Sequence, residues 1–148
     1  MSRLRVKTVI DAPPSTVWAQ VRDIATHVGW MADAVAIHFV TDQREGVGTT
    51  FDCDTRIGPF SLTDRMHITE WAEGSAMGVR HVGVVTGEGV FRLRPKGRRG
   101  KRTLFTWEER LRFPWWMGGP LGALAGSFVM RPLWNGNLRR LKRQVERG

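Results

Sequence analysis

Cysteine is almost absent from this chain, since Cys53 is the only one among 148 residues. A single cysteine excludes an internal disulfide, and no group of cysteines and histidines has the spacing of a structural zinc site. Phosphate-binding glycine loops and nucleophile-elbow motifs are missing as well. We therefore expect no metal and no other cofactor, and we interpret Cys53 as a small residue of a strand.

Long apolar runs are also missing. No stretch of about 18 apolar residues occurs, so the sequence predicts no membrane-spanning helix. The charged residues that follow Met1 lead directly into the alternating pattern of a strand, whereas in a signal peptide they would lead into a continuous apolar segment. We therefore expect a cytoplasmic protein. A chain of 148 residues has the length of one ordinary domain, large enough for a core that contains a modest cavity. We expect a single domain over residues 1–148.

Acidic residues are scarce in the second half of the chain. Residues 1–74 hold 7 basic and 10 acidic side chains, a net charge of −3, whereas residues 75–148 hold 16 and 4, a net charge of +12. Much of the excess lies near the carboxyl terminus and in a glycine-punctuated segment typical of a hairpin turn. The basic residues of this hairpin are Arg92, Arg94, Lys96, Arg98, Arg99, Lys101 and Arg102.

A basic hairpin of this kind is suited to bind the phosphates of a nucleic acid or of an anionic lipid surface. No recognition helix, zinc finger or RNP-like aromatic strand accompanies the charge, so we expect no specific nucleic-acid partner. Attachment to an anionic surface or to a nucleic acid, through the segment from Arg92 to Arg102, is kept as an alternative function.

The first thirty residues carry the most informative pattern. Apolar and charged residues alternate between Leu4 and Ile10, which is the period of a strand with one face in water. Pro13 and Pro14 then end the strand, and helical spacing begins at Pro14, because the first turn of a helix tolerates proline. The apolar stripe of this helix consists of Val17, Trp18, Val21 and Ile24.

The segment Ala12-Pro13-Pro14-Ser15-Thr16-Val17-Trp18, followed by Asp23 and Trp30, resembles the amino-terminal signature of the START/Bet v 1-like (SRPBCC) superfamily, in particular its polyketide cyclase/dehydrase-like branch. The resemblance implies an α+β helix-grip fold. In that fold a curved antiparallel sheet wraps a long C-terminal helix, two short helices follow the first strand, and an apolar cavity is enclosed. Some members resemble cyclases or dehydratases, whereas many only bind or carry lipids, hormones or polyketide-like molecules.

The middle of the chain predicts consecutive antiparallel strands joined by short turns. With the first strand they make seven, and a sheet of that size must curl and have its apolar concave face covered. The six strands expected after the helical region are Val35–Thr41, Gly48–Ile57, Phe60–Trp71, Met77–Val85, Gly87–Arg94 and Thr103–Phe113.

The last thirty-odd residues supply that cover. An apolar stripe at helical spacing, with basic residues interleaved on the other side, predicts an amphipathic helix lying on the sheet. A second stripe before it is offset in helical phase, so Pro132 and Gly136 are expected to mark a kink or a break. The later stripe is Trp134, Leu138, Leu141 and Val145, and the earlier one is Leu121, Leu124, Ala125 and Phe128.

Two adjacent indoles, Trp115 and Trp116, lie between helix breakers just before this helix. They have three interpretations: an apolar flap at the mouth of a cavity, a foot that contacts a membrane, or ordinary packing of a loop on the end of the sheet. Trp30 has two interpretations. The resemblance implies a position at the edge of the cavity, whereas packing in the core explains the residue equally well.

Alternation along the strands predicts which side chains point to the concave face. On each strand, we take the more apolar of the two alternating sets of side chains as the inner one. On Phe60–Trp71 this places His67 on the outer face. Three ionisable residues then fall on the inner face: Asp64, His81 and Glu109.

Titratable groups in an apolar cavity are either paired with one another or placed to meet a ligand. A histidine beside a carboxylate suits proton abstraction next to a carbonyl and proton return to a leaving hydroxyl, the steps of aldol-type cyclisation and dehydration. A satisfied polar network in the core is the alternative explanation of the same three residues.

We therefore expect a domain that binds a small hydrophobic ligand, lipid-like or polyketide-like, in an internal cavity. A polyketide cyclase/dehydrase-type enzyme that uses His81 with Asp64 or Glu109 is the second hypothesis. The expected ligand contacts are Trp30, Met66, Phe91, Trp107, Trp115 and Trp116.

Overall fold

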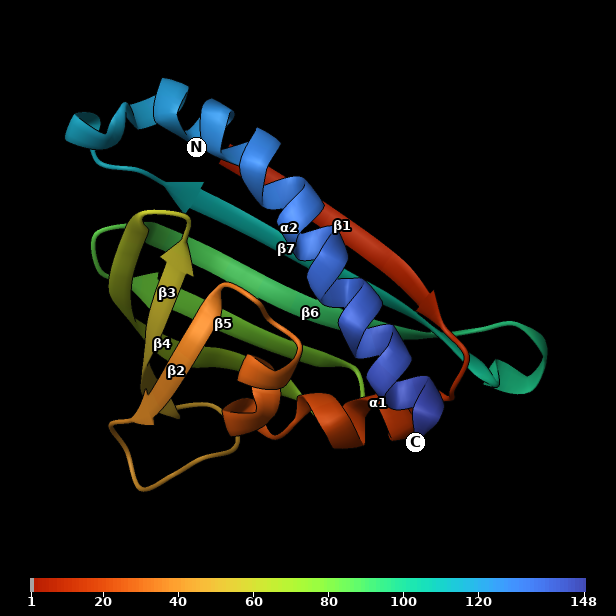
Figure 1. Ribbon diagram of the computed structural model, residues 1–148. Coiled ribbons are helices and arrows are strands. Elements are labelled where there is room, and N and C mark those ends of the chain that lie inside the picture. Colours follow the sequence, from red (N-terminus) through yellow and green to blue (C-terminus); the bar gives the residue numbers. More distant parts are fainter. Residues whose placement is uncertain (1) are drawn as a thin grey trace.

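Seven antiparallel strands form one sheet in the order β1-β7-β6-β5-β4-β3-β2 (Figure 1). The computed structural model describes residues 2–148, and all side chains among them except those of residues 2, 117, 120, 121, 123–125 and 127. The predicted α+β class and the seven strands are confirmed. The elements are β1 (Ser2–Ile10), α1 (Pro14–Val21), η1 (Ile24–Gly29), β2 (Ala34–Phe39), β3 (Thr50–Ile57), β4 (Phe60–Ala72), β5 (Ala76–Val82), β6 (Thr86–Lys96), η2 (Arg98–Gly100), β7 (Arg102–Arg112), η3 (Trp115–Met117) and α2 (Gly119–Arg147).

The first strand passes directly into α1 at the two prolines. Pro13 is extended, with φ −67° and ψ 157°, and Pro14 opens the helix, where its missing N–H has no helical partner to lose. Trp18 packs edge-on against Trp71 of β4, with ring centroids 5.2 Å apart. Both indole N–H groups donate to the carboxylate of Glu73, at 2.7 and 2.8 Å. These contacts fix α1 to the end of β4.

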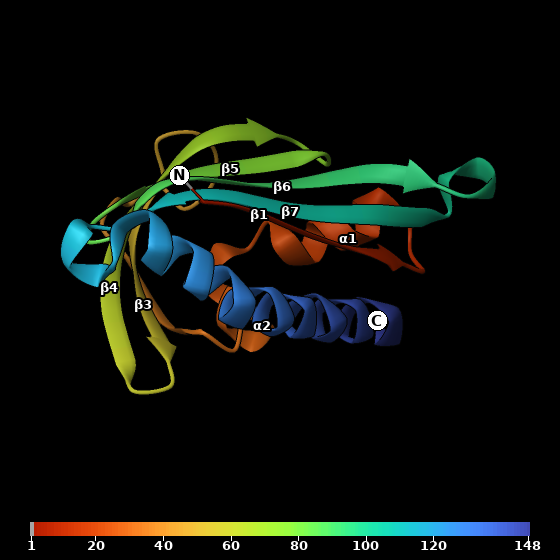
Figure 2. The ribbon, with the colours of Figure 1, turned by 90° about the horizontal axis from the view of Figure 1, so that it is seen from above.

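The sheet is strongly curved. Figure 2 shows β3 and β4 turning out of the plane of β5, β6 and β7 toward the side on which α2 lies. The ladder between β4 and β5 changes register between Ile68 and Glu70, and such a bulge bends a strand. The curvature gives the sheet a concave face, which α2 covers over β1 and β7.

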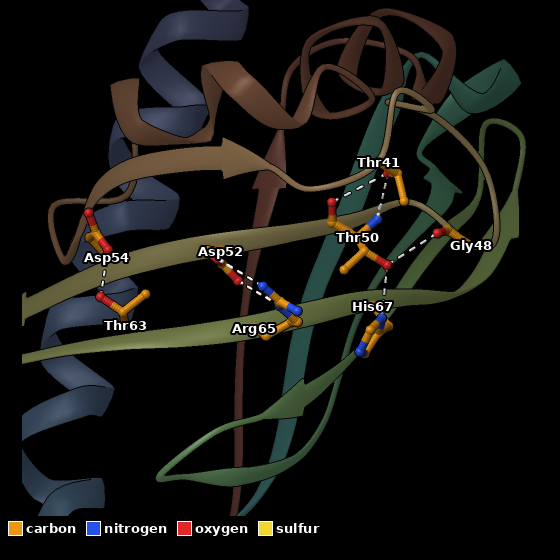
Figure 3. Close-up of polar contacts among 8 residues, drawn as sticks. All are labelled: Thr41, Gly48, Thr50, Asp52, Asp54, Thr63, Arg65 and His67. Carbon is orange, nitrogen blue, oxygen red and sulfur yellow. Dashed lines mark hydrogen bonds and ion pairs between the residues drawn. The ribbon is translucent and has the colours of Figure 1, made fainter.

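The convex face of β3 and β4 is polar and confirms the predicted alternation. Arg65 of β4 donates to Asp52 of β3 at 3.0 Å, and the hydroxyl of Thr63 donates to Asp54 at 2.7 Å (Figure 3). His67 lies 2.9 Å from the hydroxyl of Thr50 in the same row. Cross-strand pairs of this kind hold the register of the two strands.

The later apolar stripe of α2 is buried as predicted. Trp134 stacks on Trp107 of β7, with centroids 4.4 Å apart and planes 16° apart. Asn137 is fully buried, accepts the N–H of Ala32 at 3.0 Å and donates to Asp33 at 2.8 Å. The residues of the stripe, Trp134, Leu138, Leu141 and Val145, are all at most 4% exposed.

Of the kink or break expected at Pro132 and Gly136, the break does not occur, because one helix runs through Pro132 from Gly119 to Arg147. A proline inside a helix removes one backbone hydrogen bond and bends the axis without having to end the helix. Figure 2 shows the axis of α2 turning along its first half. Phe128 of the earlier stripe is 76% exposed, so this apolar residue does not lie against the sheet. The side chains of Leu121, Leu124 and Ala125 lie outside the described ones.

No helix within residues 2–148 combines the length and apolarity needed to cross a membrane.

Replacement of the buried Asn137 by alanine is expected to lower the free energy of unfolding by about 1 to 3 kcal/mol, because the N–H of Ala32 and the carboxylate of Asp33 each lose a partner. Urea unfolding followed by circular dichroism measures the change. Asn135→Ala, two residues earlier on the same helix, is the control and should leave the stability nearly unchanged. Equal losses in both variants would contradict the role given to Asn137.

Candidate ligand cavity

A cavity of about 1100 Å³ lies between the concave face of the sheet and α2. Strands β2 to β7 supply most of its wall, and Gly122, Gly126 and Met130 of α2 line the other side. The two glycines have no side chain to occupy the space, and they follow one another at helical spacing. Most of the remaining lining is aliphatic, aromatic or methionine, which is typical of a site for an apolar small molecule.

Three of the predicted ligand contacts line this cavity: Met66 of β4, Phe91 of β6 and Trp107 of β7. Trp116 also reaches the lining, although 62% of it is exposed. It therefore lies at the mouth of the cavity.

Trp30 and Trp115 are placed differently. Trp30 is 1% exposed and packs behind the cavity wall, with its ring 5.7 Å from Phe91 and 6.2 Å from Trp107. The described residues that line the cavity do not include it, so the structure agrees with its interpretation as a core residue. Trp115 is 86% exposed and likewise lies outside the lining.

The three predicted ionisable residues come together on the inner face. Asp64 of β4, His81 of β5 and Glu109 of β7 line the cavity and are 6%, 8% and 7% exposed. Nε2 of His81 lies 3.4 Å from Oε2 of Glu109, the separation of an ion pair, without the alignment of a hydrogen bond. The indole of Trp107 donates to the other oxygen of Glu109 at 3.2 Å.

Two glycines make room for the carboxylates: Gly89 within β6, and Gly83 directly after the end of β5. β6 separates β5 from β7, and its Gly89 pairs with Val79 on one side and Glu109 on the other. A Cβ at Gly89 would lie 2.8 Å from Oε1 of Glu109, so a side chain there would push the carboxylate away from His81. A Cβ at Gly83 would collide with Oδ1 of Asp64 in the same way. Sequence reasoning missed both positions, although a glycine inside a strand signals close approach of another group.

The electrostatics of the three residues follow from burial and proximity. Burial alone would lower the pKa of His81, but the neighbouring charges of Glu109 and Asp64 outweigh it and leave that pKa above its usual 6.5. Burial raises the pKa of Asp64 from its usual 3.8, against the charge of His81 and hydrogen bonds from the backbone at Val84 and Val85. Oδ1 of Asp64 has no hydrogen-bond partner among the described residues.

Two other titratable residues of the lining are neutral near pH 7. Burial lowers the pKa of His27 to about 4, and its Nε2 lies 2.7 Å from the carbonyl oxygen of Val21. Burial raises the pKa of the Cys53 thiol to about 11, which leaves it unreactive as a nucleophile. Over residues 2–148, no group of three or more histidines, cysteines and acidic residues is arranged to hold a metal ion.

The basic hairpin joins β6 to β7 through η2 and projects from the end of the molecule opposite η3 (Figures 1 and 2). Arg92 pairs with Glu70 at 3.4 Å. The other basic residues of the hairpin are exposed and form no ion pair with any residue that the structure describes. The hairpin does not contribute to the cavity, and its attachment to an anionic surface stays a prediction.

A curved antiparallel sheet that grips a long C-terminal helix around an apolar cavity defines the helix-grip fold of START-like proteins. The family model described as polyketide cyclase/dehydrase and lipid transport matches residues 1–146. The chain belongs to this family, as its amino-terminal signature predicted.

Several solved structures share the fold. TTHA0849 from Thermus thermophilus is 18% identical with a TM-score of 0.79, over 97% of this chain and 96% of its own. The Zhui aromatase/cyclase from Streptomyces is 14% identical with a TM-score of 0.78, over 98% and 93%. A START superfamily protein from Mycobacterium smegmatis is 16% identical with a TM-score of 0.74, over 99% of both chains. No curated protein matches the sequence.

Replacement of Glu109 by glutamine is expected to lower the pKa of His81, because the carboxylate that favours the imidazolium is lost while the burial remains. A titration of the histidine ring signals by NMR measures this pKa, with His81→Gln to assign the signal. Glu108→Gln is the matched control, since Glu108 pairs with Arg3 at 3.1 Å on the outer face. A pKa of His81 that stays the same in Glu109→Gln would contradict the pairing.

Proposed function

We propose that this protein binds a small, largely apolar molecule, lipid-like or polyketide-like, in the cavity between the sheet and α2. The observation that carries the proposal is the cavity itself: about 1100 Å³ with a mainly apolar lining. Water in such a space lacks polar partners over most of its surface, so an apolar occupant is favoured. Membership of a family described by both cyclase/dehydrase activity and lipid transport supports the same class of ligand.

The polar part of the ligand would lie against Asp64, His81 and Glu109, and the apolar part against Met66, Phe91 and Trp107. We propose that Trp116 contacts the ligand at the mouth of the cavity. Trp30 acts indirectly, because it supports the rings of Phe91 and Trp107 from behind. Trp115, exposed beside Trp116, is proposed only as part of the mouth through which the ligand passes.

Val79→Trp is expected to weaken binding of a neutral apolar probe, because Val79 of β5 lines the cavity and an indole there takes part of the space. N-phenyl-1-naphthylamine, whose fluorescence rises in apolar surroundings, is the probe. Val82→Trp, on the same strand at a position 46% exposed, is the control and should bind the probe as the original protein does. Equal affinity for the probe in Val79→Trp and the original protein, or no binding by the original protein, would contradict the proposal.

Catalysis of the cyclase/dehydrase type is a second candidate, favoured by the buried pair of His81 and Glu109 at an apolar wall. In such a reaction Asp64 or Glu109 would remove a proton beside a carbonyl of a poly-β-ketone. The imidazolium of His81 would then donate its proton to the leaving hydroxyl, so that water departs as the double bond forms. A fold shared with the Zhui aromatase/cyclase is compatible with this role.

Turnover of a synthetic poly-β-ketone, followed by chromatography of the products, tests the second candidate. If the protein is an enzyme, His81→Ala should reduce kcat by roughly 100-fold or more, because general acid catalysis is lost. His67→Ala, on the outer face beside Thr50 (Figure 3), should leave kcat unchanged. No turnover by the original protein, or equal turnover in both variants, would rule the catalytic role out and leave ligand binding alone.

A further inference from the structure

The cavity differs in charge from the rest of the protein. The chain carries 23 lysines and arginines and a net charge of +9, yet none of the described residues that line the cavity is a lysine or an arginine. Its charged lining consists of Asp33, Asp64, Glu109 and His81. A basic protein therefore encloses a site whose charged groups are mainly acidic.

The one cation of the lining is already engaged. His81 lies 3.4 Å from Glu109, so the charge of the imidazolium is balanced within the protein. Asp33 is also occupied, because its two oxygens accept hydrogen bonds from Trp134 at 3.3 Å and Asn137 at 2.8 Å. An anionic group entering the cavity would meet no free positive charge.

Asp64 is the acidic residue of the lining that is able to accept a hydrogen bond from a ligand. It is 6% exposed and lines the cavity, and no described side chain donates a hydrogen bond to either oxygen of its carboxylate. Removing a carboxylate oxygen from water without giving it a hydrogen-bond donor is unfavourable. A ligand hydroxyl that donates a hydrogen bond to the carboxylate compensates for this loss. A ligand carboxylate offers no proton there and adds a second negative charge.

We propose that the cavity selects apolar molecules whose polar end is an uncharged hydrogen-bond donor, such as an alcohol or phenol, and discriminates against molecules with an anionic head. This inference rests on the proposed function, because it specifies the ligand of the same site. Burying an ion without a counter-charge is strongly unfavourable. The protein therefore binds a long-chain alcohol and rejects the fatty-acid anion of equal length.

Competition between two matched ligands tests the inference. 1-Dodecanol and dodecanoate, each below its aggregation limit at pH 8, are titrated against bound N-phenyl-1-naphthylamine. The alcohol is expected to displace the probe with a Kd at least about tenfold lower than that of the anion. Asp64→Asn is expected to reduce the ratio of the two Kd values, because the acidic group is removed. Asp52→Asn, on the outer face of β3 beside Arg65, should not change that ratio.

The outcomes separate the two proposals. Equal displacement by both ligands, tighter binding of the anion, or a bound probe that neither ligand displaces would overturn the selectivity and leave the binding function standing. Failure of the probe itself to bind would instead overturn the proposed function. An unchanged ratio in a folded Asp64→Asn variant would overturn the assignment to Asp64. Circular dichroism checks folding, and Asp64→Ala replaces Asp64→Asn if that variant does not fold.

Discussion

The stacked contact between Trp107 of β7 and Trp134 of α2 holds the helix against one half of a sheet whose other half curves away. With ring centroids 4.4 Å apart, the two indoles leave no space between helix and sheet at that point. The buried hydrogen bonds of Asn137 fix the same helix to the segment between η1 and β2. The rest of the concave face is not covered so closely, and the cavity is the volume that remains.

The polar cluster within this cavity is costly for the fold. Asp64, His81 and Glu109 are nearly excluded from water, and burial of such groups is unfavourable unless they are paired. His81 and Glu109 compensate one another, whereas Oδ1 of Asp64 has no hydrogen-bond partner among the described residues. Groups kept at this cost in an apolar wall are typical of functional sites. Ligand recognition and acid–base chemistry both make use of the same arrangement.

The elements were predictable from the sequence because their patterns are local. Alternation in the strands identified the inner positions of Asp64, His81 and Glu109, and helical spacing identified the buried stripe of Trp134 to Val145. The outcome for Phe128 was different, because helical phase specifies which residues share a face and not which face turns to the sheet. Likewise, the proline at position 132 bends α2 without ending it, since packing on both sides of the bend sustains the helix.

Long-range features were less predictable. The space that Gly83 and Gly89 provide for the carboxylates depends on strand pairing, and the position of Trp30 behind the wall depends on where three aromatic rings meet. Neither follows from spacing along the chain. The absence of basic residues from the cavity lining is equally a product of the fold, because the 23 lysines and arginines are distributed along most of the sequence.

The central claim is that the cavity holds a small apolar molecule. Native mass spectrometry of the freshly purified protein tests it most directly, since the intact protein and the denatured chain can be weighed from one sample. The account predicts a species heavier than the polypeptide by one small molecule, lost on denaturation and less abundant when Val79→Trp is purified in the same way. A native mass equal to that of the bare chain, even after incubation with neutral apolar compounds, would contradict it.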